Sequence, residues 1–580
     1  MASVPEIQEH GNQPTTTSTT TDGGHVEDGG IMLGPTGLKE PQNHIQDDGQ
    51  TTQAIPSEAP RRYMEGWRLY AMISSLCLSL FLSTLETTIV STSLISITNA
   101  LGDFEQRDWV VTSYLITYTG FLVVYAKFSD ILGRKLLILV AIAFFTVFSI
   151  VCGSISNMTQ LIVFRALQGI GGSGIYAMVT CIQPELVPPE KWGNIIAVVS
   201  LVSVLSSVLG PILGGAINNH SSWRWVFLLN APAGVIATGL IAFVMPAQFP
   251  NIDDSAGLMS FHSKISRASL RRLDIIGAIL LLFSSALIVF AFEEAGSRYS
   301  WQNPTILSTI IVGGVLFIGF LGWEKVADRP RATQEPIFPL RLMKNRLVSS
   351  LTIIAFCTGP PFMTAIINLP QRFQAVDGLS PFEAGTHLLP LLLASPVATI
   401  VAGQLAAKFK VPPFYILLFG ASMQLLGIGL ASSVRFKSGN AMYGYEVIMG
   451  FGFGMGLVSL LIYTPMVVKR SDMAVAMGAI TQIRVLGGTI GLAISSTVLN
   501  NHLSSTLPAL LNPADIKQIS DSVQYINTLP DATRDAVRQI FADGFNSQMR
   551  VMMYFSVAVW VFAATLWERK LRSAANVEGY

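Results

Sequence analysis

Long apolar runs recur along most of the chain, and they restrict the folds that it can adopt more than any other feature. Each run has about 20 residues, the length that an α-helix needs to cross the hydrocarbon core of a bilayer, roughly 30 Å thick. The runs lie near residues 70–94, 108–126, 136–154, 160–181, 194–217, 226–246, 275–293, 304–323, 348–369, 383–405, 413–432, 442–467, 474–499 and 549–567. The sequence therefore predicts an all-α polytopic membrane protein with fourteen transmembrane spans.

The composition agrees with this prediction and argues against nucleic-acid binding, metal binding and nucleotide-driven functions. Of the 580 residues, 51% are hydrophobic and 13% are charged, whereas an average soluble domain is about 25% charged. The net charge of +1 offers no basic surface, so we expect the lipid bilayer as a partner and no nucleic acid. The histidines and cysteines have no metal-ligand spacing, and no nucleotide-binding Gly-Lys-Thr loop is present. We therefore expect no metal, no cofactor and no enzymatic activity.

The distribution of lysine and arginine predicts the orientation, because cytoplasmic loops are enriched in these cations. If the N-terminus is cytoplasmic, the inside loops contain Lys127, Arg134, Lys135, Lys191, Lys264, Arg267, Arg271, Arg272, Lys325, Arg329, Arg331, Arg341, Lys344, Arg346, Lys408, Lys410, Lys469 and Arg470. The short outside loops contain fewer cations, namely Arg107, Arg224, Arg298, Arg372, Arg435 and Lys437. Both termini are therefore predicted to be cytoplasmic.

Loop lengths divide the chain into segments. The predicted order is a disordered cytoplasmic tail (1–66), an N-terminal six-helix bundle (67–247), a cytoplasmic loop (248–274), an inserted helix pair (275–323), a second cytoplasmic loop (324–346), a C-terminal six-helix bundle (347–567) with a long extracellular loop (500–548), and a cytoplasmic tail (568–580). Two related helical halves are a common plan among transporters.

The loop after the second run brings an acid and a basic pair to the ends of two helices. Asp130 can pair with a cation or cap the next helix, Gly133 permits a tight turn, and Arg134 and Lys135 supply positive charge. Such a cluster can act as a latch that holds one conformation, although an ordinary positively charged inside loop would look similar. The loop resembles motif A of the major facilitator superfamily, in which these four residues match.

The fourth and fifth runs resemble two further motifs of that superfamily. Arg165 is followed by a group that resembles motif B, which is associated with proton coupling: Gln168, Gly169, Gly171 and Gly172. The fifth run contains a group that resembles motif C of the antiporter branches: Gly210, Pro211, Gly214 and Gly215. The alternatives are an arginine that reaches the membrane interface and a kinked packing helix.

Three charges inside the runs are candidates for proton coupling. Glu86 is the only acid deep in the first run, and fourteen-span drug–proton antiporters have a similar stretch, usually with Asp. A low-dielectric interior favours the protonated form of a carboxyl group, so Glu86 could take up and release a proton. Arg165 lies at a similar depth, so a pair with Glu86 is geometrically allowed, and the alternative is a purely structural ion pair. Arg484 lies near the middle of the thirteenth run.

The resemblance, which covers about residues 67–567, implies the major facilitator fold and a proton-coupled secondary transporter. Its substrate would be a small organic compound (a toxin, drug or secondary metabolite) exported by alternating access, with protons as the second partner. The alternative is an importer of the same superfamily, such as a fungal siderophore–proton symporter. An apolar and aromatic cavity would suit such a cargo, although helix packing also explains its candidate lining residues, which are Tyr114, Tyr118, Phe362, Met363, Met449 and Met477.

Location and modification complete the predictions. We expect a monomer in the plasma membrane, with the vacuolar membrane as the alternative. Asn157 and Asn219 lie in Asn-x-Ser/Thr sequons on predicted outside loops, so they are candidate N-glycosylation sites, and unmodified asparagine is the alternative.

Overall fold

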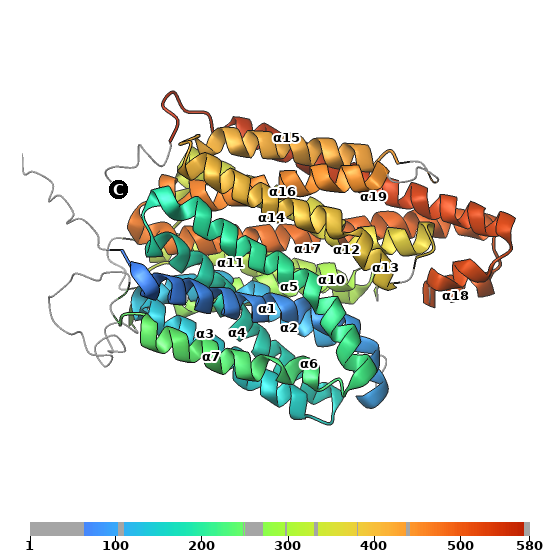
Figure 1. The fold of residues 1–580 in the computed structure, drawn as a ribbon, viewed down its shortest axis with the longest axis horizontal. Helices are drawn as coiled ribbons and strands as arrows, with labels where there is room; N and C mark the ends of the chain where they lie inside the picture. The colour runs from blue at the N-terminus through green and yellow to red at the C-terminus, as the bar shows by residue number, and fades with distance from the viewer. Residues whose placement is uncertain are drawn as a thin grey trace, which may run out of the picture. The chain divides into compact units, whose positions relative to one another are not determined.

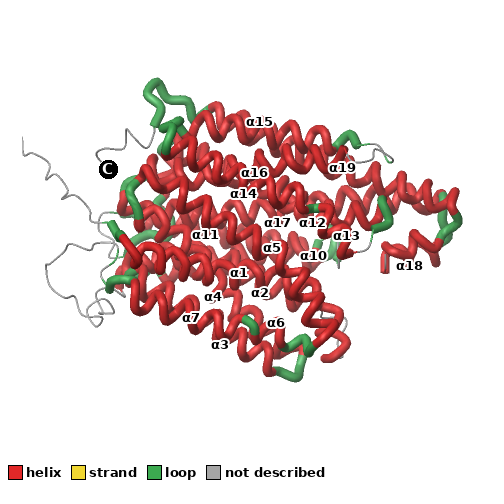
Figure 2. Tube along the Cα trace, in the orientation of Figure 1, coloured by secondary structure: helices red, strands yellow, loops and turns green. Residues whose placement is uncertain are grey.

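The described part of the chain is almost entirely helical (Figures 1 and 2). The computed structural model describes residues 63–572 except 102–108, 248, 250–270, 296–298, 330–333, 380, 435, 437–440 and 522. Among these residues, 13 helices are long and apolar enough to cross a membrane. Together with α5 (Trp192–His220, 29 residues) they occupy the positions of the predicted spans. The prediction of an all-α polytopic fold is confirmed.

The helices follow one another with short connections. Before the inserted pair come α1 (Gly66–Leu101), α2 (Trp109–Leu132), α3 (Arg134–Ser154), α4 (Met158–Leu186), α5, α6 (Trp225–Leu228) and α7 (Asn230–Val244). The inserted pair is α10 (Ile275–Glu294) and α11 (Pro304–Ala327). After it come α12 (Arg346–Val376), α13 (Pro381–His387), α14 (Leu389–Ala407), α15 (Pro413–Ala431), α16 (Ala441–Val467), α17 (Met473–Thr506), α18 (Pro513–Asp521) and α19 (Asp531–Ala564). The predicted tail at 1–66 and the loop at 248–274 lie largely outside the described residues.

Local sequence sets several helix boundaries. Gly133 separates α2 from α3 with a φ of 97°, which a residue with a Cβ rarely adopts. Asn157, Asn303 and Asn345 start α4, α11 and α12, because each side-chain oxygen accepts a hydrogen bond from the backbone N–H two residues later.

Three helices extend well past the apolar runs. Helix α12 continues to Val376, so Arg372, which we predicted in an outside loop, is buried within the helix. Helix α17 ends at Thr506 and α19 begins at Asp531, so much of 500–548, predicted as a loop, is helix. A 34-residue helix such as α17 is about 50 Å long and exceeds the hydrocarbon core. These extensions bury an apolar cluster of their own, which includes Val376, Leu507 and Phe541.

The two halves repeat one packing pattern. Helix α4 packs against α2 and α3, and α16 packs in the same way against α14 and α15. Helix α1 packs against α5 and α7, and α12 packs against α17 and α19. The first six spans and the last six therefore form two bundles of the same architecture, and α10 of the inserted pair packs against one helix of each, α2 and α17.

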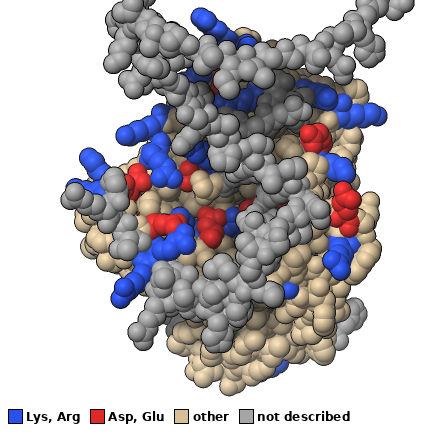
Figure 3. Space-filling model, turned by 90° about the vertical axis from the view of Figure 1, so that its left-hand side faces the viewer, with Lys and Arg blue, Asp and Glu red and all other residues tan. Residues whose placement is uncertain are grey.

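The described residues have two ends, which we call the terminal face, where α1 begins and α19 ends, and the distal face, opposite it (Figure 1). The two bundles touch near the terminal face. A Cβ on Gly193 of α5 would lie 2.3 Å from the carbonyl oxygen of Gly403 of α14, so only glycine allows this approach. The next residues also meet, since Gln404 Nε2 donates to Asn194 Oδ1 at 2.7 Å. Lysine and arginine side chains surround this face (Figure 3).

Candidate functional site

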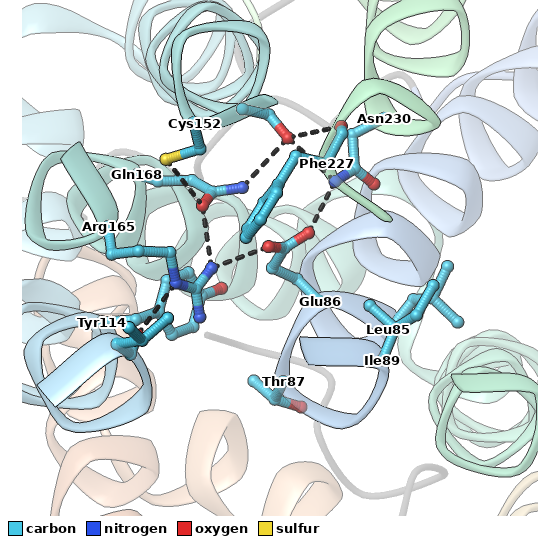
Figure 4. Close-up of polar contacts among 12 residues, drawn as sticks. Leu85, Glu86, Thr87, Ile89, Tyr114, Cys152, Arg165, Gln168, Phe227 and Asn230 are labelled. Carbon is cyan, nitrogen blue, oxygen red and sulfur yellow. Dashed lines mark hydrogen bonds and ion pairs between the residues drawn. The ribbon is translucent and has the colours of Figure 1, made fainter. Parts of the chain in front are cut away.

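A buried ion pair joins α1 to α4 inside the first bundle. Figure 4 shows Glu86 pointing from α1 toward Arg165, whereas Leu85, Thr87 and Ile89 point elsewhere. Arg165 Nη1 lies 2.7 Å from Glu86 Oε1, and the two residues are 1% and 0% exposed. The structure therefore brings together two of the three coupling candidates.

Neutral polar groups complete the contacts of Glu86. Asn230 Nδ2, at the start of α7, donates to Glu86 Oε2 at 2.6 Å and to Ser149 Oγ at 2.9 Å. Ser149 also accepts from Gln168 Nε2 at 3.1 Å and donates to the carbonyl of Phe227 at 2.8 Å. Four helices, α1, α3, α4 and α7, thus contribute side chains to one buried polar network.

Arg165 has partners besides the carboxylate. Its Nη1 donates to Gln168 Oε1 at 2.8 Å, and its Nε donates to the carbonyl oxygen of Val110 at 3.0 Å. The guanidinium also lies over the ring of Tyr114, 4.3 Å from the centroid, in a cation–π contact. If Glu86 became neutral, Arg165 would therefore keep several favourable contacts.

The glycines of the motif B-like and motif C-like segments allow the helices around this network to approach. A Cβ on Gly169 would lie 2.5 Å from the carbonyl oxygen of Tyr114, and one on Gly171 would lie 2.4 Å from the backbone nitrogen of Phe145. A Cβ on Gly210 of α5 would lie 1.9 Å from Thr88 Oγ1, two residues beyond Glu86. The remaining motif residues are less informative: Gly172 faces the hydroxyl of Tyr114, Gly214 is buried, Gly215 faces open space, and the side chain of Pro211 is outside the described set.

The motif A-like residues form a second cluster, at the terminal face. Arg134 pairs with Asp130 at 2.6 Å and donates two hydrogen bonds to Glu185 of α4, at 3.0 and 2.9 Å. Lys135 instead donates to the backbone carbonyls of Ala242 and Met245 at the end of α7, where a cation stabilises a helix C-terminus.

Ion pairs also tie the loop after α11 to the rest of the terminal face. Lys127 of α2 pairs with Glu335 at 2.9 Å, and Arg272 pairs with the other oxygen of the same carboxylate. Partial burial opposes ionisation of Glu335, but the bonds from Lys127 and Arg272 hold its pKa below the usual value. Farther along the loop, Arg341 pairs with Asp472, the N-cap residue of α17, at 2.8 Å.

Arg484 lies apart from the Glu86–Arg165 pair. Its Nη2 donates to the hydroxyl of Tyr176 on α4 at 3.2 Å, and its guanidinium lies 5.8 Å from the ring centroid of Phe362 on α12. Tyr118 lies beside Tyr176 and stacks on Tyr114. Aromatic side chains of both bundles therefore surround Arg484. Among the other candidate lining residues, Met363 lies against Gly488, while Met449 packs on Gly427 and Met477 is buried.

Several residues of these clusters were not singled out by sequence reasoning. Asn230, Glu185 and Glu335 contact charged residues from distant positions in the chain. Ser149 accepts a hydrogen bond from Asn230. A polar side chain inside an apolar run was the one available signal for Ser149 and Asn230. Of the two sequons, Asn157 is exposed and caps α4, and the side chain of Asn219 lies outside the described set.

Comparison with known proteins identifies the family to which this helical chain belongs. The family model described as Major Facilitator Superfamily matches residues 76–333 and 295–492. The chain belongs to the Major Facilitator Superfamily. The first match covers most of the first bundle and the inserted pair, and the second covers much of the second bundle. The crystal structure of a double-tryptophan XylE mutant has the same fold, with a TM-score of 0.53 at 13% identity over 88% of this chain and 98% of that one.

Fungal members of the superfamily are similar over most of their length. The MFS-type transporter FPY5 of Fusarium mangiferae is 49% identical over 514 residues, which cover 88% of this chain and 86% of that protein. The MFS thioclapurine efflux transporter tcpA of Claviceps purpurea is 29% identical, over 81% of this chain and 85% of its own length. The rubrofusarin-specific efflux pump aurT of Gibberella zeae is 28% identical, over 89% and 95%.

Proposed function

We propose that this chain exports a small organic compound in exchange for protons, with Glu86 as the proton-binding group. The observation that carries the proposal is the Glu86–Arg165 pair, whose atoms lie 2.7 Å apart and are almost fully buried. A buried ion pair adds little to stability compared with apolar packing, so its presence in a membrane bundle favours a functional role.

The surroundings of the pair are suited to a carboxyl group that changes its protonation state. In the charged state, Glu86 accepts from Arg165 and Asn230. When a proton binds, the ion pair is lost, but Gln168, the Val110 carbonyl and the Tyr114 ring still hold Arg165. Protonation can then weaken the tie between α1 and α4 without leaving an isolated cation, and this allows the bundle to adopt a second arrangement.

Alternating access would follow from the contacts between the bundles. They touch near the terminal face through Gly193 and Gly403 and through Asn194 and Gln404. If both termini are cytoplasmic, as the excess of cations on that face favours, this conformation is closed toward the cytoplasm. The pair of Lys127 with Glu335, in the loop that leads to the second bundle, would stabilise that closed state as a latch, while the pairs of Arg134 would hold α2, α3 and α4 of the first bundle together.

Export is favoured over import by the relatives. Two of them are named as efflux pumps for fungal metabolites, thioclapurine and rubrofusarin. The motif C-like segment of α5, which packs on α1 beside Glu86, points the same way. We place the protein in the plasma membrane as a non-enzymatic, monomeric transporter with both termini cytoplasmic, and its cargo among small organic secondary metabolites.

The experiment compares wild type with Glu86→Gln in secretory vesicles. We expect efflux driven by a pH gradient to fall by at least about tenfold, equivalent to about 1.4 kcal/mol, while cargo exchange without a gradient persists. Glu190→Gln, at an exposed acid on the terminal face, is the matched control. Gradient-driven transport at the wild-type rate in the Glu86 variant would rule out this residue as the coupling site, and cargo uptake into cells instead of efflux would establish an importer.

A further inference from the structure

The second bundle carries a buried arginine and a buried glutamate on the helices that correspond to α1 and α4. Helix α12 corresponds to α1, because it packs on α17 and α19 as α1 packs on α5 and α7. Helix α16 corresponds to α4, because it packs on α14 and α15 as α4 packs on α2 and α3. Helix α12 carries Arg372 and α16 carries Glu446. The order of the charges is therefore reversed relative to Glu86 and Arg165.

Both residues are buried, but they are not joined. Arg372 is 4% and Glu446 is 0% exposed. Neither carboxyl oxygen of Glu446 has a hydrogen-bond partner among the described residues, and the same holds for Arg372 Nε. The nearest acid to Arg372 is Asp377, one turn farther along, with Nη1 and Oδ2 4.0 Å apart.

The environment of Glu446 is apolar. Met442 and Met449 lie one turn to either side of it on the same face of α16. Both belong to an apolar cluster with Leu369 and Phe373, which flank Arg372 on α12. Glu446 therefore projects into packed hydrocarbon side chains near the distal ends of α12 and α16.

An ionised carboxylate without donors in such a cluster is strongly unfavourable, whereas a neutral carboxyl group is tolerated far better. We propose that Glu446 is a second proton-binding site, protonated in the present conformation and ionised when it pairs with Arg372 in another. A proton from the distal side would bind the carboxylate and break that pair, and Arg372 would turn toward Asp377. The inference extends the proposed proton coupling to the second bundle, but its test requires no transport.

Charged and titratable groups around Glu446 and the neighbouring Asp377 come from four elements. They are Arg372 and Asp377 of α12 and its C-cap, His387 of α13, Tyr443 of α16, and Arg538 of α19, which acts on Asp377. Burial raises the pKa of Asp377, and Arg372, Arg538 and His387 oppose this shift.

The remaining helices that pack on α16 add little charge near Glu446. Helix α14 has no titratable residue, and α15 has Tyr415 at its opposite end. On α17, Arg484 contacts Tyr176 and Phe362, and His502 lies near Gly544. The side chain of His220 on α5 is outside the described set. Among the described residues, Arg372 is therefore the cation placed to stabilise an ionised Glu446.

The test is infrared spectroscopy of the full-length protein in lipid nanodiscs over a pH series, without cargo. We expect a pH-dependent C=O stretching band of a protonated carboxyl group that disappears in Glu446→Gln and moves in frequency in Glu446→Asp. Glu383→Gln, at an exposed acid of α13, is the matched control and should keep the band. Identical spectra for wild type and the Glu446 variants would overturn the proposal.

The role of Arg372 is tested in the same series. In Arg372→Leu the band should persist to a pH at least one unit higher, because the ionised form has lost its counter-charge. An unchanged titration would overturn the assignment of Arg372. These outcomes are separate from the proposed export activity, since a protein that did not couple to protons in transport would still show, or lack, the Glu446 band.

Discussion

Glu86 lies on α1, which faces α4, and Glu446 lies on α16, which corresponds to α4 and faces α12 in the second bundle. The surroundings of the two acids differ. Glu86 accepts hydrogen bonds at 2.7 and 2.6 Å from Arg165 and Asn230, whereas Glu446 accepts none from the described residues. The first carboxyl group sits in a polar network, and the second sits among methionine, leucine and phenylalanine side chains.

The difference shows that one architecture can hold a buried acid in two ways. A cation together with an amide donor stabilises the ionised form of Glu86, and an apolar cluster favours the neutral form of Glu446. If the two bundles exchange these roles during a cycle, one acid is charged while the other is neutral, and the cost of burying charge inside the membrane is limited to one pair at a time.

The largest expected effect separates the two arginines. Arg165→Leu removes the cation paired with Glu86, and breaking a buried pair costs about 3–5 kcal/mol of stability. Arg372→Leu should cost about 1 kcal/mol or less, because Glu446 is unpaired and leucine suits the cluster around it. Thermal unfolding of the purified variants, followed by size-exclusion chromatography, measures both. Equal losses would mean that the two acids are held in the same way.

A smaller effect is expected when the first site is made more like the second. Asn230→Leu removes the donor to Glu86 Oε2, and a hydrogen bond to a charged group contributes about 1.5–3 kcal/mol. The pH profile of transport should therefore move to higher pH by about one to two units, since the carboxylate has lost stabilisation. Asn218→Leu, at an amide of α5 that bonds Ser93 instead, is the control. A profile that stays in place would contradict the role of the network.

The smallest effect concerns the loop after α11, which lies on the terminal face and belongs to neither bundle. Glu335→Gln weakens the pair with Lys127, and because the Glu335 side chain is 36% exposed, the change should stay within about 1 kcal/mol. The pKa of Glu335 is lowered in the folded protein, so its contribution is present above the unfolded pKa and is lost only as pH falls through the lower folded pKa.

The ratio of transport by Glu335→Gln to wild type should consequently be constant between about pH 6 and 8. Transport measured at several external pH values gives this ratio, with Glu190→Gln as the reference. A ratio that changes across this range would show that the loop, and not the buried acids alone, senses protons.

The fold could be predicted because membrane insertion leaves a strong pattern in the chain. Apolar runs and loop cations suffice to locate spans, and Glu86 and Arg165 were recognisable as charges inside such runs. Arg372 was missed because the hydropathy falls at Pro370-Gln371-Arg372 although α12 continues to Val376. Asn230 and Glu185 were missed for another reason, since their partners lie 144 and 51 residues away in the chain, and one sequence contains no sign of such pairing.

The inserted helices make the two seams between the bundles unequal. Helix α10 packs on α2 of one bundle and α17 of the other, so it lies along one of the two seams between them, and α11 covers it from outside. The other seam, between α5 and α14, has no such cover from this pair. The inserted pair therefore makes the two sides of the paired bundles unequal, with two additional helices over one seam and direct contact between α5 and α14 at the other.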